Sequence, residues 1–183
     1  LTFIADAENQ PASEHAISRA SERFRTLRGM ERWLPSLTGD AAAAEPQLLM
    51  KIDAPPATFL NRNTLQTEAD WQRLLDDLLA LLRTLRERGF HVSRLRPGWA
   101  VWTADGLRYC SPWPVSQRES EDSLSAIWWF FQDLAENGPD WRNWPIAPPC
   151  GKLSEAIPET VRNRIEQLVE VPDLDAALKL IHP

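Results

Sequence analysis

One amphipathic segment, residues 67–88, constrains the fold more than any other part of the sequence. Thr67 with Asp70 predicts a helix cap at its start, and Gly89 suits the left-handed conformation that follows a helix end. Its apolar residues recur at spacings of three and four, and they are Trp71, Leu74, Leu75, Leu78, Leu82 and Leu85. This periodicity predicts a long helix that buries one face against the rest of the protein.

A second helix is predicted at residues 120–136. Its middle, residues 127–131, reads Ile-Trp-Trp-Phe-Phe and is apolar nearly all round, so we expect this helix to be buried on several sides. Two shorter helices are expected at residues 154–169 and 172–181, the latter with proline in its first turn. These segments predict a helix-rich second half of the chain.

The first part of the chain predicts a small β-layer. Residues 1–5 are compatible with a strand, residues 11–32 have helical periodicity that Gly29 and Pro35 end, and residues 47–52 are again strand-like. The alanine-rich residues 38–46 indicate a surface loop.

A hairpin and a proline-rich loop complete the expected elements. Residues 102–109 predict a hairpin in which Asp105 and Gly106 supply both turn residues, which pairs Trp102 with Tyr109. Residues 137–151 are rich in proline and tryptophan and predict a structured loop. The chain is therefore expected to be α+β, with a reduced strand–helix–strand region at residues 1–60 and a helical region at residues 61–183, in one compact unit.

Charge and cysteine content restrict the function. A net charge of −6 opposes binding to the phosphate backbone of nucleic acids. Cys110 and Cys150 have neither CxxC nor Cys/His spacing, so we expect reduced thiols, no zinc site and no cofactor. The longest apolar run, residues 126–131, is too short to span a bilayer, and no signal-peptide pattern is visible, so we expect a cytoplasmic protein without membrane insertion.

The order of these elements resembles the protein kinase-like fold of bacterial sugar and lipopolysaccharide kinases. Residues 22–34 look like the small-lobe helix of that family, and residues 47–52 look like the strand before its hinge. Arg94-Leu95-Arg96-Pro97 falls where such kinases have Asp-Leu-Lys-Pro. Asp122 matches the aspartate that braces the catalytic loop in the family, and the resemblance implies that it has this structural role.

The groups that phosphoryl transfer requires are replaced in this sequence. Arg94 stands at the position of the catalytic aspartate, Trp99 at that of the metal-binding asparagine and Ser111 at that of the metal-binding aspartate. No lysine precedes Lys51 to hold a nucleotide phosphate. The resemblance therefore implies a degenerate pseudokinase with no catalytic, cofactor-binding or metal-binding residues.

Other ionisable residues are more consistent with structure than with chemistry. His91 is a lone histidine, which is more often structural than catalytic, and the acidic pair Asp76-Asp77 is expected on a helix surface. Asp105 and Gly106 are assigned to the hairpin turn. The nine tryptophans exceed what a core of this size needs. One or two of those in loops are open candidates for partner anchors, the alternative being a structural role; these are Trp99, Trp113, Trp141 and Trp144.

The sequence favours a non-catalytic, kinase-like domain that binds another protein as a regulatory or scaffold module. An atypical phosphotransferase on the same scaffold, with Asp53, Asp122 or Glu22 in new roles, is a rival interpretation. A third is a helical adaptor or immunity protein unrelated to kinases, which would lack a small β-layer.

Overall fold

The computed structural model describes the middle of the chain almost continuously, together with shorter segments on either side. The described residues are Leu27, Gly29, Met30, 32–34, 36–40, 47–51, 58–90, Val92, 95–109, 123–136, 151–171, 176 and 177. Only the backbone is described at residues 36–40 and 47–51 and at Trp99 and Ser123. The strand expected at residues 1–5 and the proline-rich loop at residues 137–150 lie outside this set.

The described elements alternate between short strands and long helices. In chain order they are β1 (Ser36–Asp40), β2 (Gln47–Lys51), β3 (Thr58–Phe59), the 3-10 turn η1 (Arg62–Thr64), α2 (Glu68–Glu87), the 3-10 turn η2 (Pro97–Trp99), β4 (Ala100–Thr103), β5 (Gly106–Tyr109), α3 (Ser123–Glu136) and α4 (Glu159–Glu170). The predicted α+β, helix-rich fold class is confirmed.

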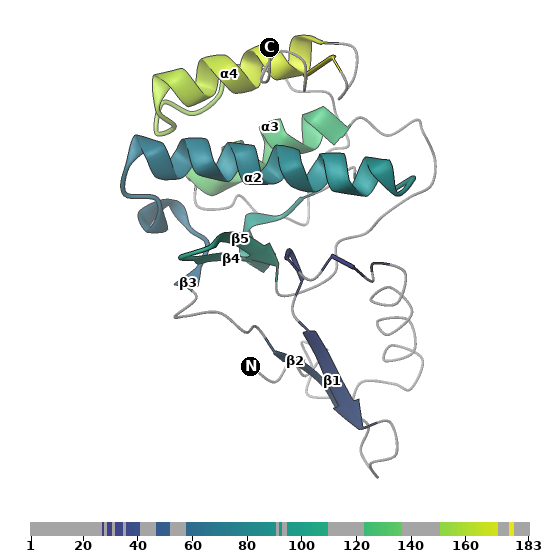
Figure 1. The fold of residues 1–183 in the computed structure, drawn as a ribbon. Coiled ribbons are helices and arrows are strands. Elements are labelled where there is room, and N and C mark those ends of the chain that lie inside the picture. Colours follow the sequence, from purple (N-terminus) through teal and green to yellow (C-terminus); the bar gives the residue numbers. More distant parts are fainter. Residues whose placement is uncertain are drawn as a thin grey trace.

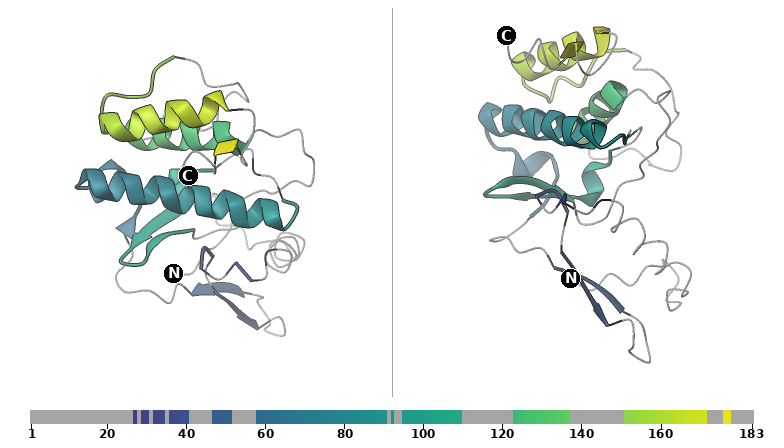
Figure 2. Two further views of the ribbon diagram at one scale, coloured as in Figure 1. Left: turned by 45° about the horizontal axis from the view of Figure 1, so that its top comes forward. Right: turned by 45° about the vertical axis from the view of Figure 1, so that its right-hand side comes forward.

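The elements are arranged in layers, as Figures 1 and 2 show. Helix α4 is outermost and packs on α3 and α2. The antiparallel sheet, in the order β3-β4-β5, lies on the opposite side of α2 from α4. The separate β1–β2 pair lies at the end of the molecule farthest from α4 (Figure 1).

Helix α2 forms as its sequence pattern predicts. Thr67 is the N-cap, and its side chain and that of Asp70 bond each other's backbone N–H groups in a capping box. Gly89 follows the helix end with a φ of 75°. All six predicted stripe residues are buried, and β5, α3 and α4 pack on α2.

Helices α3 and α4 complete the core. Trp128, Phe130 and Phe131 are buried on α3, and the Phe131 ring lies 6.0 Å from the ring of Trp71 on α2. Helix α4 begins at Glu159, five residues later than expected, because Pro158 disfavours helical backbone at the residue before it. Among the described residues, no helix combines the length and apolarity needed to cross a bilayer.

Three β-strand predictions need correction or completion. The strand expected at residues 47–52 is present as β2, but Ser36–Asp40, most of which was expected to be loop, pairs with it antiparallel. The short strand β3 pairs with β4 and was not predicted. Pairing with the nearby strand β2, rather than the β-propensity of its own residues, makes a strand of the polar sequence SLTGD.

The predicted hairpin is present with a different register. Thr103 pairs with Gly106 and Trp102 with Leu107, so Ala104 and Asp105 occupy the turn. The expected pairing of Trp102 with Tyr109, and the turn formed by Asp105 and Gly106, are therefore wrong. The Thr103 hydroxyl donates to the Gly106 carbonyl at 2.9 Å and accepts from the Asp105 N–H at 3.2 Å, which stabilises the observed register.

Candidate functional site: the junction of the hairpin with α2

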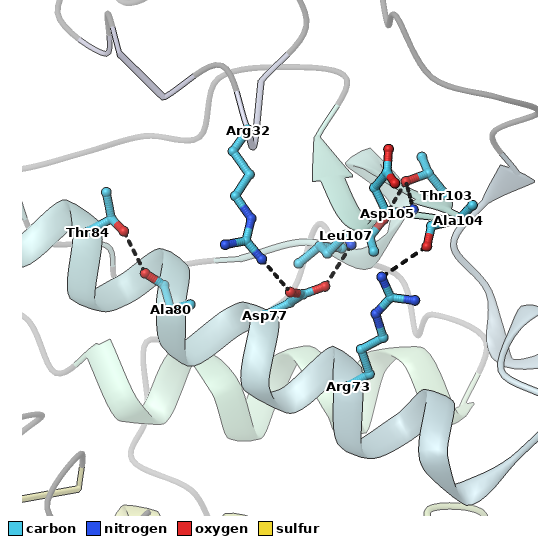
Figure 3. A network of polar contacts seen from close by, with 10 residues as sticks. Arg32, Arg73, Asp77, Ala80, Thr84, Thr103, Ala104, Asp105 and Leu107 are labelled. Carbon is cyan, nitrogen blue, oxygen red and sulfur yellow. Dashed lines mark hydrogen bonds and ion pairs between the residues drawn. The ribbon is translucent and has the colours of Figure 1, made fainter. Parts of the chain in front are cut away.

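Asp77 on α2 holds the outer edge of the β4–β5 hairpin. Its Oδ2 accepts a hydrogen bond from the Leu107 backbone N–H at 2.9 Å, and its Oδ1 lies 3.3 Å from the Arg32 guanidinium (Figure 3). Asp77 is only 7% exposed, so the prediction that it lies on the helix surface is wrong. Both of its carboxylate oxygens are engaged within the fold.

Gly106 lies against the Asp77 carboxylate. A Cβ atom at this position would lie 2.2 Å from Asp77 Oδ2, and the glycine φ of 107° is a conformation that other residues rarely adopt. The position therefore requires glycine for two separate reasons. Gly106 was predicted as a turn residue, whereas in the structure it begins β5.

Arg73, one helical turn before Asp77, binds the other end of the same hairpin. Its guanidinium donates to the Ala104 carbonyl at 3.0 Å (Figure 3). The same guanidinium lies 5.6 Å from the centre of the Trp102 ring. On helix α2, Arg73 thus donates to the hairpin turn and Asp77 accepts from β5. These two residues are four positions apart and lie on the same helix face, so the hairpin is attached to α2 at two points.

The segment around Trp33 closes the same sheet edge. The Tyr109 N–H donates to the Trp33 carbonyl at 2.7 Å. Leu107, two residues earlier in β5, is the residue whose N–H donates to Asp77. Arg32 reaches Asp77 and lies 4.6 Å from the centre of the Trp33 ring. Because the Arg32 side chain is 66% exposed, solvent screens this ion pair, and the hydrogen bond to Leu107 is the stronger contact.

Burial governs the electrostatics of this junction. It raises the pKa of the Asp77 carboxyl above its usual value, while the Leu107 N–H and the charges of Arg32 and Arg73 oppose that rise. A shielded carboxylate whose two oxygens already have partners is suited to bracing the hairpin. Among the described residues, no group of three or more His, Cys, Asp or Glu side chains is placed to hold a metal ion.

Most of the proposed interaction residues lie outside the described part of the chain. Trp113, Trp141, Trp144 and Asp122 are in this category, and of Trp99 only the backbone, within η2, is described. Asp105 is exposed in the hairpin turn. Of the predicted site residues, only Gly106 is shown to lie beside Asp77.

The sequence analysis did not identify Asp77 as a junction residue, although its spacing from neighbouring leucines indicates a buried position. It lies three residues after Leu74 and four before Leu81, both of which are fully buried. These intervals place it on the buried face, whereas its neighbour Asp76 points outward and pairs with Arg164 of α4 at 2.9 Å.

Comparison with known proteins gives a distant structural likeness. No family model and no curated protein matches the sequence. A solved structure of the bifunctional kinase-methyltransferase WbdD is similar to this chain, with 15% sequence identity and a TM-score of 0.46. The similarity covers 92% of this chain and 44% of that one, so the chain spans less than half of the length of WbdD in that structure.

Proposed function

We propose that this chain is a kinase-like domain without phosphotransferase activity that acts by binding another protein, as a regulatory or scaffold module. The observation that carries the proposal is the engagement of Asp77. This buried acidic residue beside the hairpin accepts the Leu107 N–H and pairs with Arg32, so it serves the fold.

The residue types along the chain support the same proposal. Where the kinase resemblance requires a catalytic aspartate and two metal ligands, the sequence has Arg94, Trp99 and Ser111. A guanidinium, an indole and a hydroxyl do not provide the carboxylate and amide oxygens that magnesium prefers. The described β1–β2 pair also supports a scaffold with a small β-layer rather than an all-helical adaptor.

The proposed interface does not use strand addition at the three-stranded sheet. The Leu107 and Tyr109 N–H groups on the outer edge of β5 already bond Asp77 and Trp33. At the other edge, the Phe59 carbonyl accepts from the Asn61 side chain at 3.1 Å. Occupied backbone groups disfavour an added strand, so exposed aromatic anchors are the more suitable recognition elements.

Alanine substitution in the proline-rich loop tests the proposed interface. After a partner has been identified by co-purification with the tagged chain, we expect Trp141→Ala or Trp144→Ala to weaken its affinity by about 2 kcal/mol, roughly thirtyfold, as for a hot-spot residue. Calorimetric titration of the purified partner measures the change. Phe59→Ala is the matched control, because Phe59 is an aromatic residue that is 47% exposed on a different element. Unchanged affinity in both tryptophan variants would remove this loop from the interface.

A further inference from the structure

Arg32 and Arg73 bring two exposed guanidinium groups to Asp77 from different parts of the chain. Arg32 lies 3.3 Å from Asp77 Oδ1. A Cβ atom at Gly106 would lie 3.5 Å from Arg73 Nη2 and 2.2 Å from Asp77 Oδ2, which places Arg73 near the other carboxylate oxygen. In Figure 3 both arginine side chains lie on the side of α2 from which Asp77 projects. Since Asp77 is buried and both arginines are exposed, the two positive charges face solvent.

An aromatic ring and a hydrogen bond hold each guanidinium in place. Arg32 lies 4.6 Å from the centre of the Trp33 ring, and Arg73 lies 5.6 Å from the centre of the Trp102 ring. In the described contacts, each arginine donates one hydrogen bond. A guanidinium carries several N–H donors, so each arginine keeps donors for a further acceptor. Because both groups are already positioned, they lose little conformational entropy when they bind a ligand.

The acidic residues near Arg73 in the sequence have other roles. Asp70 closes the capping box of α2, and Asp76 pairs with an arginine of α4. Asp105 lies in the hairpin turn, where its described hydrogen bond is made by its backbone N–H. Among the residues that the structure describes, Arg73 forms no ion pair, and its hydrogen bond goes to the neutral Ala104 carbonyl. An external carboxylate would therefore give Arg73 a charged partner.

We propose that Arg32, Arg73 and Trp102 form a surface, the arginine surface, that binds an acidic segment of a protein partner. This inference rests on the proposed function and adds the chemistry of the partner to it. Guanidinium groups bind carboxylates through paired hydrogen bonds, and Arg and Trp are enriched among the residues that dominate interfaces. The chain has a net charge of −6, so it does not attract acidic peptides in general, and binding depends on this local surface.

Titration of the full chain with a fluorescein-labelled octaglutamate peptide tests this surface. We expect saturable binding at about 50 mM salt that weakens as salt is added, because dissolved ions screen exposed charges. In NMR spectra, the Trp102 indole N–H signal, assigned with Trp102→Phe, should move as the peptide binds, since Arg73 lies over this ring. Absence of binding, or binding that leaves this signal in place, would overturn the proposal.

Three arginine variants test which charges bind the peptide. Arg32→Gln and Arg73→Gln should each weaken the affinity for octaglutamate about tenfold, the scale of one lost charge-assisted hydrogen bond. Arg83→Gln is the matched control and should leave the affinity unchanged, because Arg83 is an exposed arginine of α2 that already pairs with Glu87. The urea midpoint of each variant checks that its fold is intact. Equal losses in all three variants would overturn the proposal.

The same variants separate this inference from the proposed function. A protein partner captured by co-purification should also bind Arg32→Gln and Arg73→Gln more weakly than Arg83→Gln. A partner that binds all three variants as tightly as the natural chain would exclude the arginine surface and leave the protein-binding function standing.

Discussion

Gly106→Ala is expected to lower the free energy of unfolding by about 3 kcal/mol, measured by urea denaturation. Two costs combine: a positive φ imposes about 1–3 kcal/mol on a residue with a side chain, and overpacking adds about 1–3 kcal/mol. The overpacking arises because the new Cβ atom would meet Asp77 Oδ2 at 2.2 Å. The hairpin must move away from α2 to accommodate it, which strains the hydrogen bond to Leu107.

Two other glycines separate these costs. Gly89 has a φ of 75°, and a Cβ atom there would have no neighbouring atom within 4 Å, so Gly89→Ala carries the backbone cost alone, about 1 kcal/mol. Gly98 has neither a positive φ nor a close neighbour, so Gly98→Ala should be close to neutral. The expected order of destabilisation is Gly106, Gly89, Gly98. Equal effects at Gly106 and Gly89 would show that the contact with Asp77 is unimportant.

Asp77→Ala is expected to cost about 2 to 3 kcal/mol of unfolding free energy. The substitution leaves the Leu107 N–H without its acceptor inside the protein, and a buried unsatisfied donor costs about 1–3 kcal/mol. It also removes the partner of Arg32 and leaves a space beneath the hairpin. Urea denaturation with an unchanged m-value would identify the loss as one of stability.

Asp77→Asn and Asp76→Ala are the matched controls. Asparagine keeps an oxygen that can accept from Leu107 and removes a carboxylate whose pKa burial raises, so its cost should be well below that of alanine. Asp76 makes a partly exposed ion pair with Arg164, whose loss should cost at most about 1 kcal/mol. A loss at Asp76 as large as that at Asp77 would contradict the assignment of Asp77 as the brace.

The effects of Gly106→Ala and Asp77→Ala on the free energy of unfolding should also be coupled. Removal of the Asp77 side chain eliminates the atoms that a Cβ at position 106 would meet. Gly106→Ala should therefore cost less in the Asp77→Ala background than in the natural chain, with a coupling energy of about 1 kcal/mol or more. Additive effects would show that the cost of Gly106→Ala does not arise from the contact with Asp77.

Local patterns allowed α2 and α3 to be predicted because helix periodicity and capping are encoded within a few turns. The Thr67–Asp70 capping box and the buried leucine face of α2 are both as expected. The apolar middle of α3 is likewise buried, with Trp129 partly exposed. In each case the residues that make the pattern are those that make the contacts.

Long-range contacts decided the features that the sequence did not reveal. The Asp105-Gly106 pair predicts a hairpin, but Thr103 and the carboxylate of Asp77, 30 positions before Leu107, favour a different register. The pairing of β1 with β2 is a local exception, which the residue types of Ser36–Asp40 did not indicate.

Calorimetric titration of the chain with ATP and magnesium tests the central claim most directly. The proposed kinase-like domain has Arg94, Trp99 and Ser111 where the resemblance places the catalytic aspartate and the metal ligands, so it should not hold a metal-bound triphosphate. The account predicts no saturable heat of binding at millimolar nucleotide. A saturable isotherm that requires magnesium would contradict it.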